Sequence, residues 1–207
     1  MNRLLVLVLA MLVVACGGRQ SVLMQDSNQT TTVDTAKAEA LAAEAKALWA
    51  ERGNLEKANA AIAKWQDASK ADASNPIYQR ELSNAYYFMN NVHVRWSTKD
   101  KKATQLANYL KGVEAAERAL GLANPAFAAL IKSGEDSDEV WTKALKSARK
   151  EDVKTLYWYA VHLAKWAKLK SLPAILKYKN RALLVIQTCK TLEPEFFHGG
   201  PSRYLGT

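Results

Sequence analysis

The spacing of the apolar residues is the feature that most constrains how this chain can fold. From about Thr35 onward, apolar residues recur at steps of three and four within stretches of strong helix formers, such as "AKAEALAAEAKALWAERG". No segment shows the sustained two-residue alternation of a half-buried β-strand. The sequence therefore predicts an all-α fold for this region.

Turn and capping residues divide the region into successive helices. Gly53 and Asn54 end the first helix, and "DASNP" separates the second from a third that opens at Pro76, because proline suits a first helical turn. Ser137 or Asp138 is expected to cap a later helix, and Asp152 the one after it. The further helices are expected at about 103–122, briefly from 125, at 139–149, after 152 and at 173–192. Helices joined by short turns indicate antiparallel pairs.

Two degenerate units in this array resemble the tetratricopeptide repeat. The first has Ala61, Trp65 and Ala68 at the small-large-small spacing of the second helix of a repeat. The second unit is interrupted, and Gly112 and Ala116 stand at the same offsets. We therefore expect residues 35–207 to form antiparallel helix pairs in a tetratricopeptide-like α-solenoid.

The first sixteen residues, "MNRLLVLVLAMLVVAC", have the layout of a secretory signal. Their apolar run is shorter than the about 20 residues that a membrane span needs. The end of the run resembles the lipobox of bacterial lipoproteins, which implies that Cys16 is acylated and becomes the new N-terminus. An ordinary cleaved signal with a chance cysteine is the alternative. We expect residues 1–16 to be a signal peptide and a lipid on Cys16 to anchor the protein to the inner leaflet of the outer membrane, in the periplasm.

Residues 17–34 are polar and without periodicity, which predicts a flexible tether. The formal net charge is +9, a balance found in proteins that bind nucleic acids or anionic surfaces. The lysines are scattered, however, and a periplasmic protein meets no genomic DNA. We expect a solvated basic face and no nucleic-acid binding, while an acidic partner surface stays open as an alternative.

Residues able to support catalysis are sparse. His93, His162 and His198 lie far apart in the sequence, and none pairs with a cysteine at metal-ligand spacing. Cys189 lies in an apolar helical stretch and is expected to be a small buried side chain. We expect no enzyme, no metal and no cofactor.

The aromatic segment "TLYWYAVHLAKWAKL" carries apolar residues on two helical faces, so both faces should be buried. One face packs against neighbouring helices. The other either belongs to the core as well or lines a groove for an apolar or amphipathic ligand. The groove candidates are Tyr157, Trp158, His162 and Trp166.

Three segments in order, "GVEAAERALGLANPAF", "TLYWYAVHLAKWAKL" and "FFHGGPSRYLG", resemble the T-component family of TRAP transporters, known as TatT. The last segment is the most specific, and its matching residues are Gly199, Gly200, Pro201, Arg203, Leu205 and Gly206. The resemblance implies a non-enzymatic periplasmic lipoprotein built from tetratricopeptide-like helices. It also implies binding to the substrate-binding P subunit and a homotrimer with a hydrophobic pore for an apolar small molecule.

In that family the final motif is internal, so we expect the C-terminal helices of the family to be missing here. Read physically, the glycines permit positive φ and close backbone approach. Proline stiffens the turn, Leu205 anchors it, and Arg203 forks to a carboxylate or to helix-end carbonyls. The alternative function is a tetratricopeptide scaffold lipoprotein that binds peptides in outer-membrane or envelope assembly.

Overall fold

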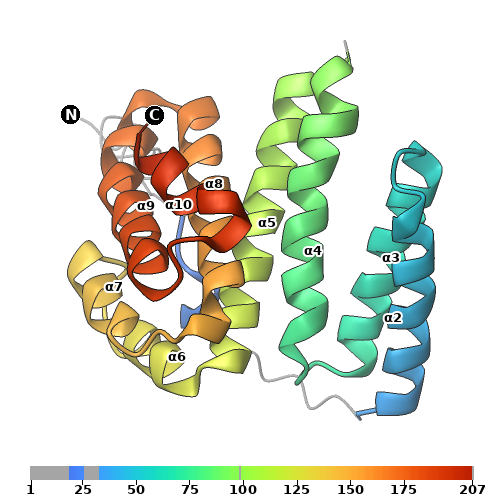
Figure 1. The fold of residues 1–207 in the computed structure, drawn as a ribbon, viewed down its shortest axis with the longest axis horizontal. Helices are drawn as coiled ribbons and strands as arrows, with labels where there is room; N and C mark the ends of the chain where they lie inside the picture. Colours follow the sequence, from blue (N-terminus) through green and yellow to red (C-terminus); the bar gives the residue numbers. More distant parts are fainter. Residues whose placement is uncertain (1–18, 26–32, 98, 207) are drawn as a thin grey trace, which may run out of the picture.

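The structure is a computed structural model that describes residues 19–25, 33–97 and 99–206 of the 207-residue chain (Figure 1). The described elements are η1 (Val22–Met24), α2 (Thr35–Ala50), α3 (Leu55–Ala71), α4 (Pro76–Phe88), η2 (Met89–His93), η3 (Val94–Trp96), α5 (Lys101–Ala123), α6 (Pro125–Lys132), α7 (Asp138–Leu145), η4 (Lys150–Asp152), α8 (Val153–Lys170), α9 (Leu172–Leu192) and α10 (Phe196–Leu205). All of them are helical, which confirms the predicted all-α fold.

The long helices pack as antiparallel pairs, α2 with α3, α4 with α5, and α8 with α9 (Figure 1). The α4–α5 pair lies in the middle, with α2 and α3 on one side and α8 and α9 on the other. The short helices α6 and α7 pack together beside α5 and α9, and α10 lies over α9 and α8. The predicted pairing is confirmed, and the tetratricopeptide-like solenoid stays a prediction.

Local capping chemistry fixes where most helices begin. An Asn or Ser side chain accepts a hydrogen bond from a backbone N–H of the first turn, which satisfies a donor that the helix itself leaves unpaired. Proline follows the cap in three of these helices, α4, α6 and α9. The capping residues are Asn54, Asn75, Asn124, Ser137 and Ser171.

Asp152 is the N-cap residue of α8, but the prediction that its side chain caps this helix is wrong. Asp152 precedes α8, but its carboxylate accepts hydrogen bonds from the backbone N–H of Arg149 and from the side-chain amide of Asn124, each at 3.0 Å. Residues 150–152 form a short 3-10 turn, so the carboxylate points back along the chain. Asp152 therefore links the start of α8 to the start of α6. The helix before it, α7, ends at Leu145, earlier than the predicted end at residue 149.

Two main hydrophobic cores hold the helices together. The larger core lies between α5, α8 and α9 and includes Trp141 of α7, whose ring stacks on Tyr159 with centroids 4.5 Å apart. The smaller core joins α2, α3 and α4 around Trp65, and Ala115 of α5 also contributes to it. The α4–α5 pair thus links the two cores.

The predicted tether does not hold for residues 19–25, which pack against the domain. Arg19 donates two hydrogen bonds to the Glu117 carboxylate, at 2.7 and 2.6 Å, and the backbone N–H of Val22 donates a third at 3.0 Å. Leu23 is buried against Gly121, where a Cβ atom would lie 2.4 Å from the leucine side chain. A fully buried carboxylate needs such partners, because burial of a lone charge is costly.

The predicted signal peptide, the lipidated Cys16 and residues 26–32 of the tether lie outside the described residues. Within the residues that are described, no helix combines the length and the apolar content that a membrane crossing requires.

Candidate functional site

The four groove candidates lie on α8 and are all buried, with exposed fractions of 8% or less. They point to different neighbours. Tyr157 and Trp158 contact Phe197 of the α10 segment, and Trp166 packs against Tyr178 of α9. A ligand groove lined by these side chains stays a prediction, since they line neither of the cavities described below.

His162 of α8 is fully buried where α8 packs against the α4–α5 pair. Its Nε2–H donates to the backbone carbonyl of Ser83 at 2.8 Å, because a carbonyl can only accept. Burial lowers the pKa of His162 to about 4, and the Lys165 ammonium adds to this effect. A Cβ atom on Gly112 would lie 2.2 Å from the imidazole. This environment favours a neutral packing role for His162.

The C-terminal motif forms a sharp turn at the start of α10. Phe197, His198 and Gly199 have left-handed backbone angles, with φ of 50°, 56° and 71°. Glycine adopts this conformation readily, whereas Phe197 and His198 adopt it at a cost in strain. A helical turn then starts at Gly200 and Pro201, both buried.

Arg203 holds this turn closed by donating to the backbone carbonyls of His198 and Phe197. Of the two acceptors expected for Arg203, a carboxylate or backbone carbonyls, the structure shows backbone carbonyls. Gly200 lies close against Tyr157, since a Cβ atom there would be 3.1 Å from the tyrosine hydroxyl. Leu205 packs partly buried on the larger core, as expected, and Gly206 follows at the C-cap.

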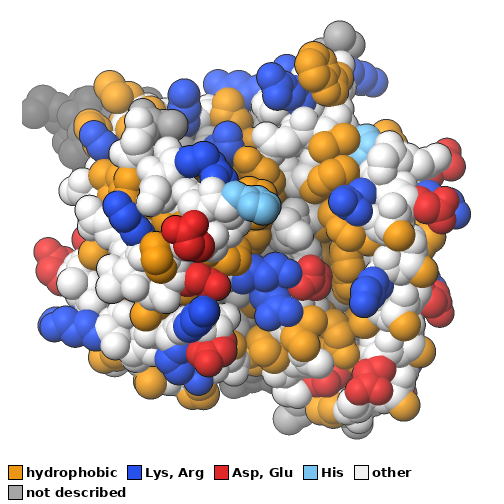
Figure 2. All heavy atoms as spheres, viewed as in Figure 1, with side chains coloured by type: hydrophobic (Ala, Val, Ile, Leu, Met, Phe, Trp, Pro, Cys, Tyr) orange, Lys and Arg blue, Asp and Glu red, His pale blue; other side chains and the backbone are white. Residues whose placement is uncertain are grey.

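Aromatic side chains of α8 and α10 pack together at this turn. We call Tyr157, Trp158, Phe196 and Phe197 the aromatic turn. The ring centroids of its neighbouring members lie 5.2 to 6.3 Å apart. Phe197 is 51% exposed. The face that carries α10 otherwise mixes charged side chains of both signs with apolar patches (Figure 2). An exposed aromatic side chain on strained backbone is a candidate contact point for a partner.

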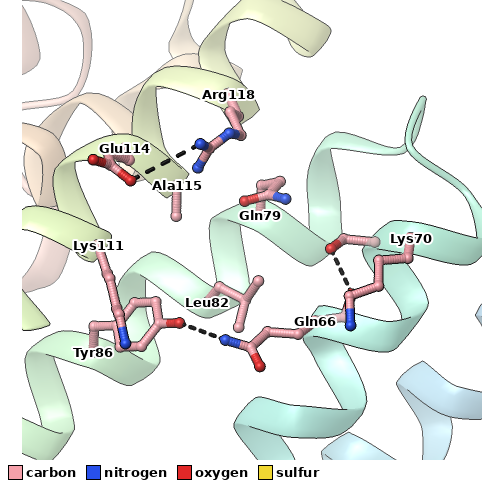
Figure 3. Close-up of a pocket in the computed structure, with 10 residues that line it drawn as sticks. Gln66, Lys70, Gln79, Leu82, Tyr86, Lys111, Glu114, Ala115 and Arg118 are labelled. Carbon is pink, nitrogen blue, oxygen red and sulfur yellow. Dashed lines mark hydrogen bonds and ion pairs between the residues drawn. The ribbon is translucent and has the colours of Figure 1, made fainter. Parts of the chain in front are cut away.

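A second surface, which we call the basic cleft, runs between α3, α4 and α5 (Figure 3). It consists of two adjoining cavities of about 370 and 440 Å³. The second cavity extends to η1 and α6. The two cavities share Ser69, Lys70, Gln79 and Arg118.

Side chains from three helices converge on the first cavity (Figure 3). Gln66 donates to the Tyr86 hydroxyl at 2.9 Å, and the Lys111 ammonium lies 5.9 Å from the centre of the Tyr86 ring. Arg118 pairs loosely with Glu114, at 3.9 Å. Sequence reasoning missed the basic cleft because its positive residues are dispersed along the chain and meet only through helix packing.

The isolated reactive residues of the sequence do not form a site in the described part of the chain. Cys189 is fully buried, as predicted, and burial raises the pKa of its thiol to about 12. Among residues 19–25, 33–97 and 99–206, no group of three or more His, Cys, Asp or Glu side chains is arranged to hold a metal ion.

A comparison with protein-family models gives a match to the C-terminal half of the chain. The model of the TRAP transporter T-component family matches residues 95–207, from within η3 through α10. The match covers α5, α8 and the glycine-rich turn, which carry the three segments of the sequence resemblance. No curated protein matches the chain. Because the match spans more than half of the 207 residues, the chain belongs to the TRAP transporter T-component family.

Proposed function

We propose that this transport component is a non-enzymatic periplasmic lipoprotein that binds the substrate-binding P subunit of its transporter. The family match over residues 95–207 is the observation that carries the proposal. The aromatic turn suits such a contact, because Phe197 is exposed and Arg203 holds its backbone carbonyl and that of the next residue, His198, by hydrogen bonds. Rigid, exposed aromatic side chains are typical anchors of protein interfaces.

The lipid anchor is the second part of the proposal. The docked position of Arg19 limits how far the domain can lie from that lipid. Cys16 precedes Arg19 by three residues, which span roughly 10 Å when fully extended. Arg19 is fixed to Glu117 on α5. A lipid on Cys16 would therefore hold the domain against the inner leaflet of the outer membrane. Fatty-acid labelling of wild type and Cys16→Ser tests this, and a labelled, processed Cys16→Ser protein would refute it.

A homotrimer with a hydrophobic pore for an apolar small molecule is the third part, and it rests on the family resemblance. Tyr157, Trp158, His162 and Trp166 are the proposed lining. These side chains are buried, so this part requires α8 to separate from its neighbours when the trimer or the ligand binds. Sedimentation of residues 17–207 tests the trimer, and a monomer at all concentrations would refute it.

The central experiment is a pull-down with immobilised residues 17–207. A P subunit of a TRAP transporter from the same organism is the expected partner, and it should be retained from a purified mixture. The alternative is a scaffold lipoprotein for envelope assembly. Failure to retain the purified P subunit, with retention of an outer-membrane assembly factor, would favour the scaffold.

A further inference from the structure

The basic cleft lies apart from the aromatic turn and has no role in the function proposed above. We propose that it binds an extended acidic peptide segment of a partner protein. The inference does not depend on which protein that partner is.

The cleft has the length of a short peptide. Lys111, Ala115, Arg118 and Leu122 follow at steps of four and three, so they share one face of α5. Lys111 and Leu122 are eleven positions apart, which is roughly 16 Å along the helix at about 1.5 Å per residue. An extended chain rises about 3.3 Å per residue. This face is therefore about as long as five residues of extended peptide.

The floor and the opposite wall are suited to a peptide backbone. Leu82 and Tyr86 of α4 are buried and form an apolar floor. Gln79 borders both cavities, and its amide makes no hydrogen bond with another described residue. Such an amide can donate to a peptide carbonyl and accept from a peptide N–H.

The charge of the cleft selects an acidic peptide. Four cationic side chains line the two cavities, against a single carboxylate, Glu114. The four are Lys70, Lys111, Arg118 and Lys132. Positive side chains gathered in one cleft repel one another, which raises the electrostatic free energy of the unliganded protein. A negatively charged ligand offsets this repulsion.

Two of these cations have no ion-pair partner in the described part of the chain. Lys70 pairs with Asp67 at 2.8 Å and Arg118 with Glu114 at 3.9 Å. Among the described residues, no carboxylate lies within ion-pairing distance of Lys111 or Lys132. Lys111 borders only the first cavity and Lys132 only the second, so the free charges stand in different parts of the cleft.

This separation favours a chain with several carboxylates over a small organic anion, which could reach only one of the two cavities. Single-stranded nucleic acid is disfavoured for another reason. Binding of that kind uses exposed aromatic rings on which bases stack. The aromatic side chain of this cleft, Tyr86, is 7% exposed.

Fluorescence polarisation with a labelled pentaglutamate peptide tests the inference on residues 17–207. The wild-type protein should bind this peptide and not the matching pentaglutamine. The double variant Lys111→Gln, Lys132→Gln should bind about tenfold more weakly, as expected for the loss of two charge-assisted contacts. The control double variant Lys46→Gln, Lys190→Gln removes the same charge at exposed positions outside the cleft and should bind like wild type.

Three outcomes would overturn the inference. The first is that wild type does not bind pentaglutamate. The second is that the control variant loses as much affinity as the cleft variant, which would indicate general attraction to a basic protein. The third is that glutarate displaces the labelled peptide at the same concentration as unlabelled pentaglutamate does, which would indicate a site for small anions. Unchanged thermal melts of both double variants show that the comparison is between folded proteins.

Discussion

His162 is a titratable side chain that the folded protein keeps neutral. The Tyr87 and Tyr109 rings meet it edge-on, and Lys165 is the nearby charge that disfavours its protonation. The folded pKa is about 4, below the unfolded value of about 6.5. Between these values the unfolded chain binds a proton that the folded chain does not. The contribution of His162 to stability is therefore complete above about pH 6.5, falls as the pH drops toward 4, and is constant below that.

We predict that His162 makes stability depend on pH in the weakly acidic range. From pH 7.5 to pH 5, wild type should lose about 2 kcal/mol of unfolding free energy through this group. His162→Gln keeps a donor for the Ser83 carbonyl and cannot titrate, so its loss should be smaller by that amount. Urea unfolding at the two pH values measures both, and equal losses in the two proteins would contradict the assignment.

Gly112 is the position that lets α5 approach α8. Gly112→Ala should destabilise the protein by about 1 to 3 kcal/mol, because the new methyl group overlaps the His162 ring. Gly53→Ala is the matched control, since a Cβ atom at Gly53 meets nothing within 4 Å. Thermal unfolding of the two variants and of wild type measures this difference in stability. A similar small effect of both substitutions would show that the two helices are not tightly packed here.

At the scale of elements, the docked segment that contains η1 depends on one buried ion pair. Arg19→Ala should cost about 3 kcal/mol or more, because it leaves the Glu117 carboxylate buried with the Val22 N–H as its remaining partner. Adding Glu117→Gln to Arg19→Ala should recover part of that loss, since the buried charge is gone. Urea unfolding of residues 17–207 measures both, and an Arg19→Ala protein as stable as wild type would show that the segment does not depend on this pair.

The elements that could be predicted from sequence are those whose ends are set by nearby residues. Asn54, Asn75 with Pro76, and Ser137 mark helix starts by chemistry that acts within one turn. A forked contact of Arg203 was likewise predictable, because its acceptors lie five and six residues away. The choice of carbonyls over a carboxylate was not.

The remaining features depend on contacts between distant parts of the chain. Arg19 meets Glu117 across 98 residues, so a polar stretch that reads as a tether is docked instead. The basic cleft combines faces of three helices and was not foreseen for the same reason. On α8 the periodicity correctly indicated burial on both faces, but it could not tell whether Trp158, His162 and Trp166 line a groove or a core.

At the scale of the whole molecule, the two candidate surfaces differ in chemistry. The aromatic turn is apolar, strained and held by Arg203, and it lies within the region that matches the family. The basic cleft draws residues both from this region and from α3 and α4, which precede it. A T component with this arrangement has one surface suited to an apolar contact and another suited to an acidic chain.

Calorimetric titration of the purified P subunit into residues 17–207 tests whether the two proteins bind each other. Wild type should show saturable binding. Phe197→Ala should lose about 2 kcal/mol, roughly thirtyfold in affinity. Leu176→Ala, an exposed apolar position on α9, should leave the affinity unchanged. Absence of binding by folded wild-type protein would contradict the proposed function, and equal affinities of all three proteins would contradict the aromatic turn as its contact surface.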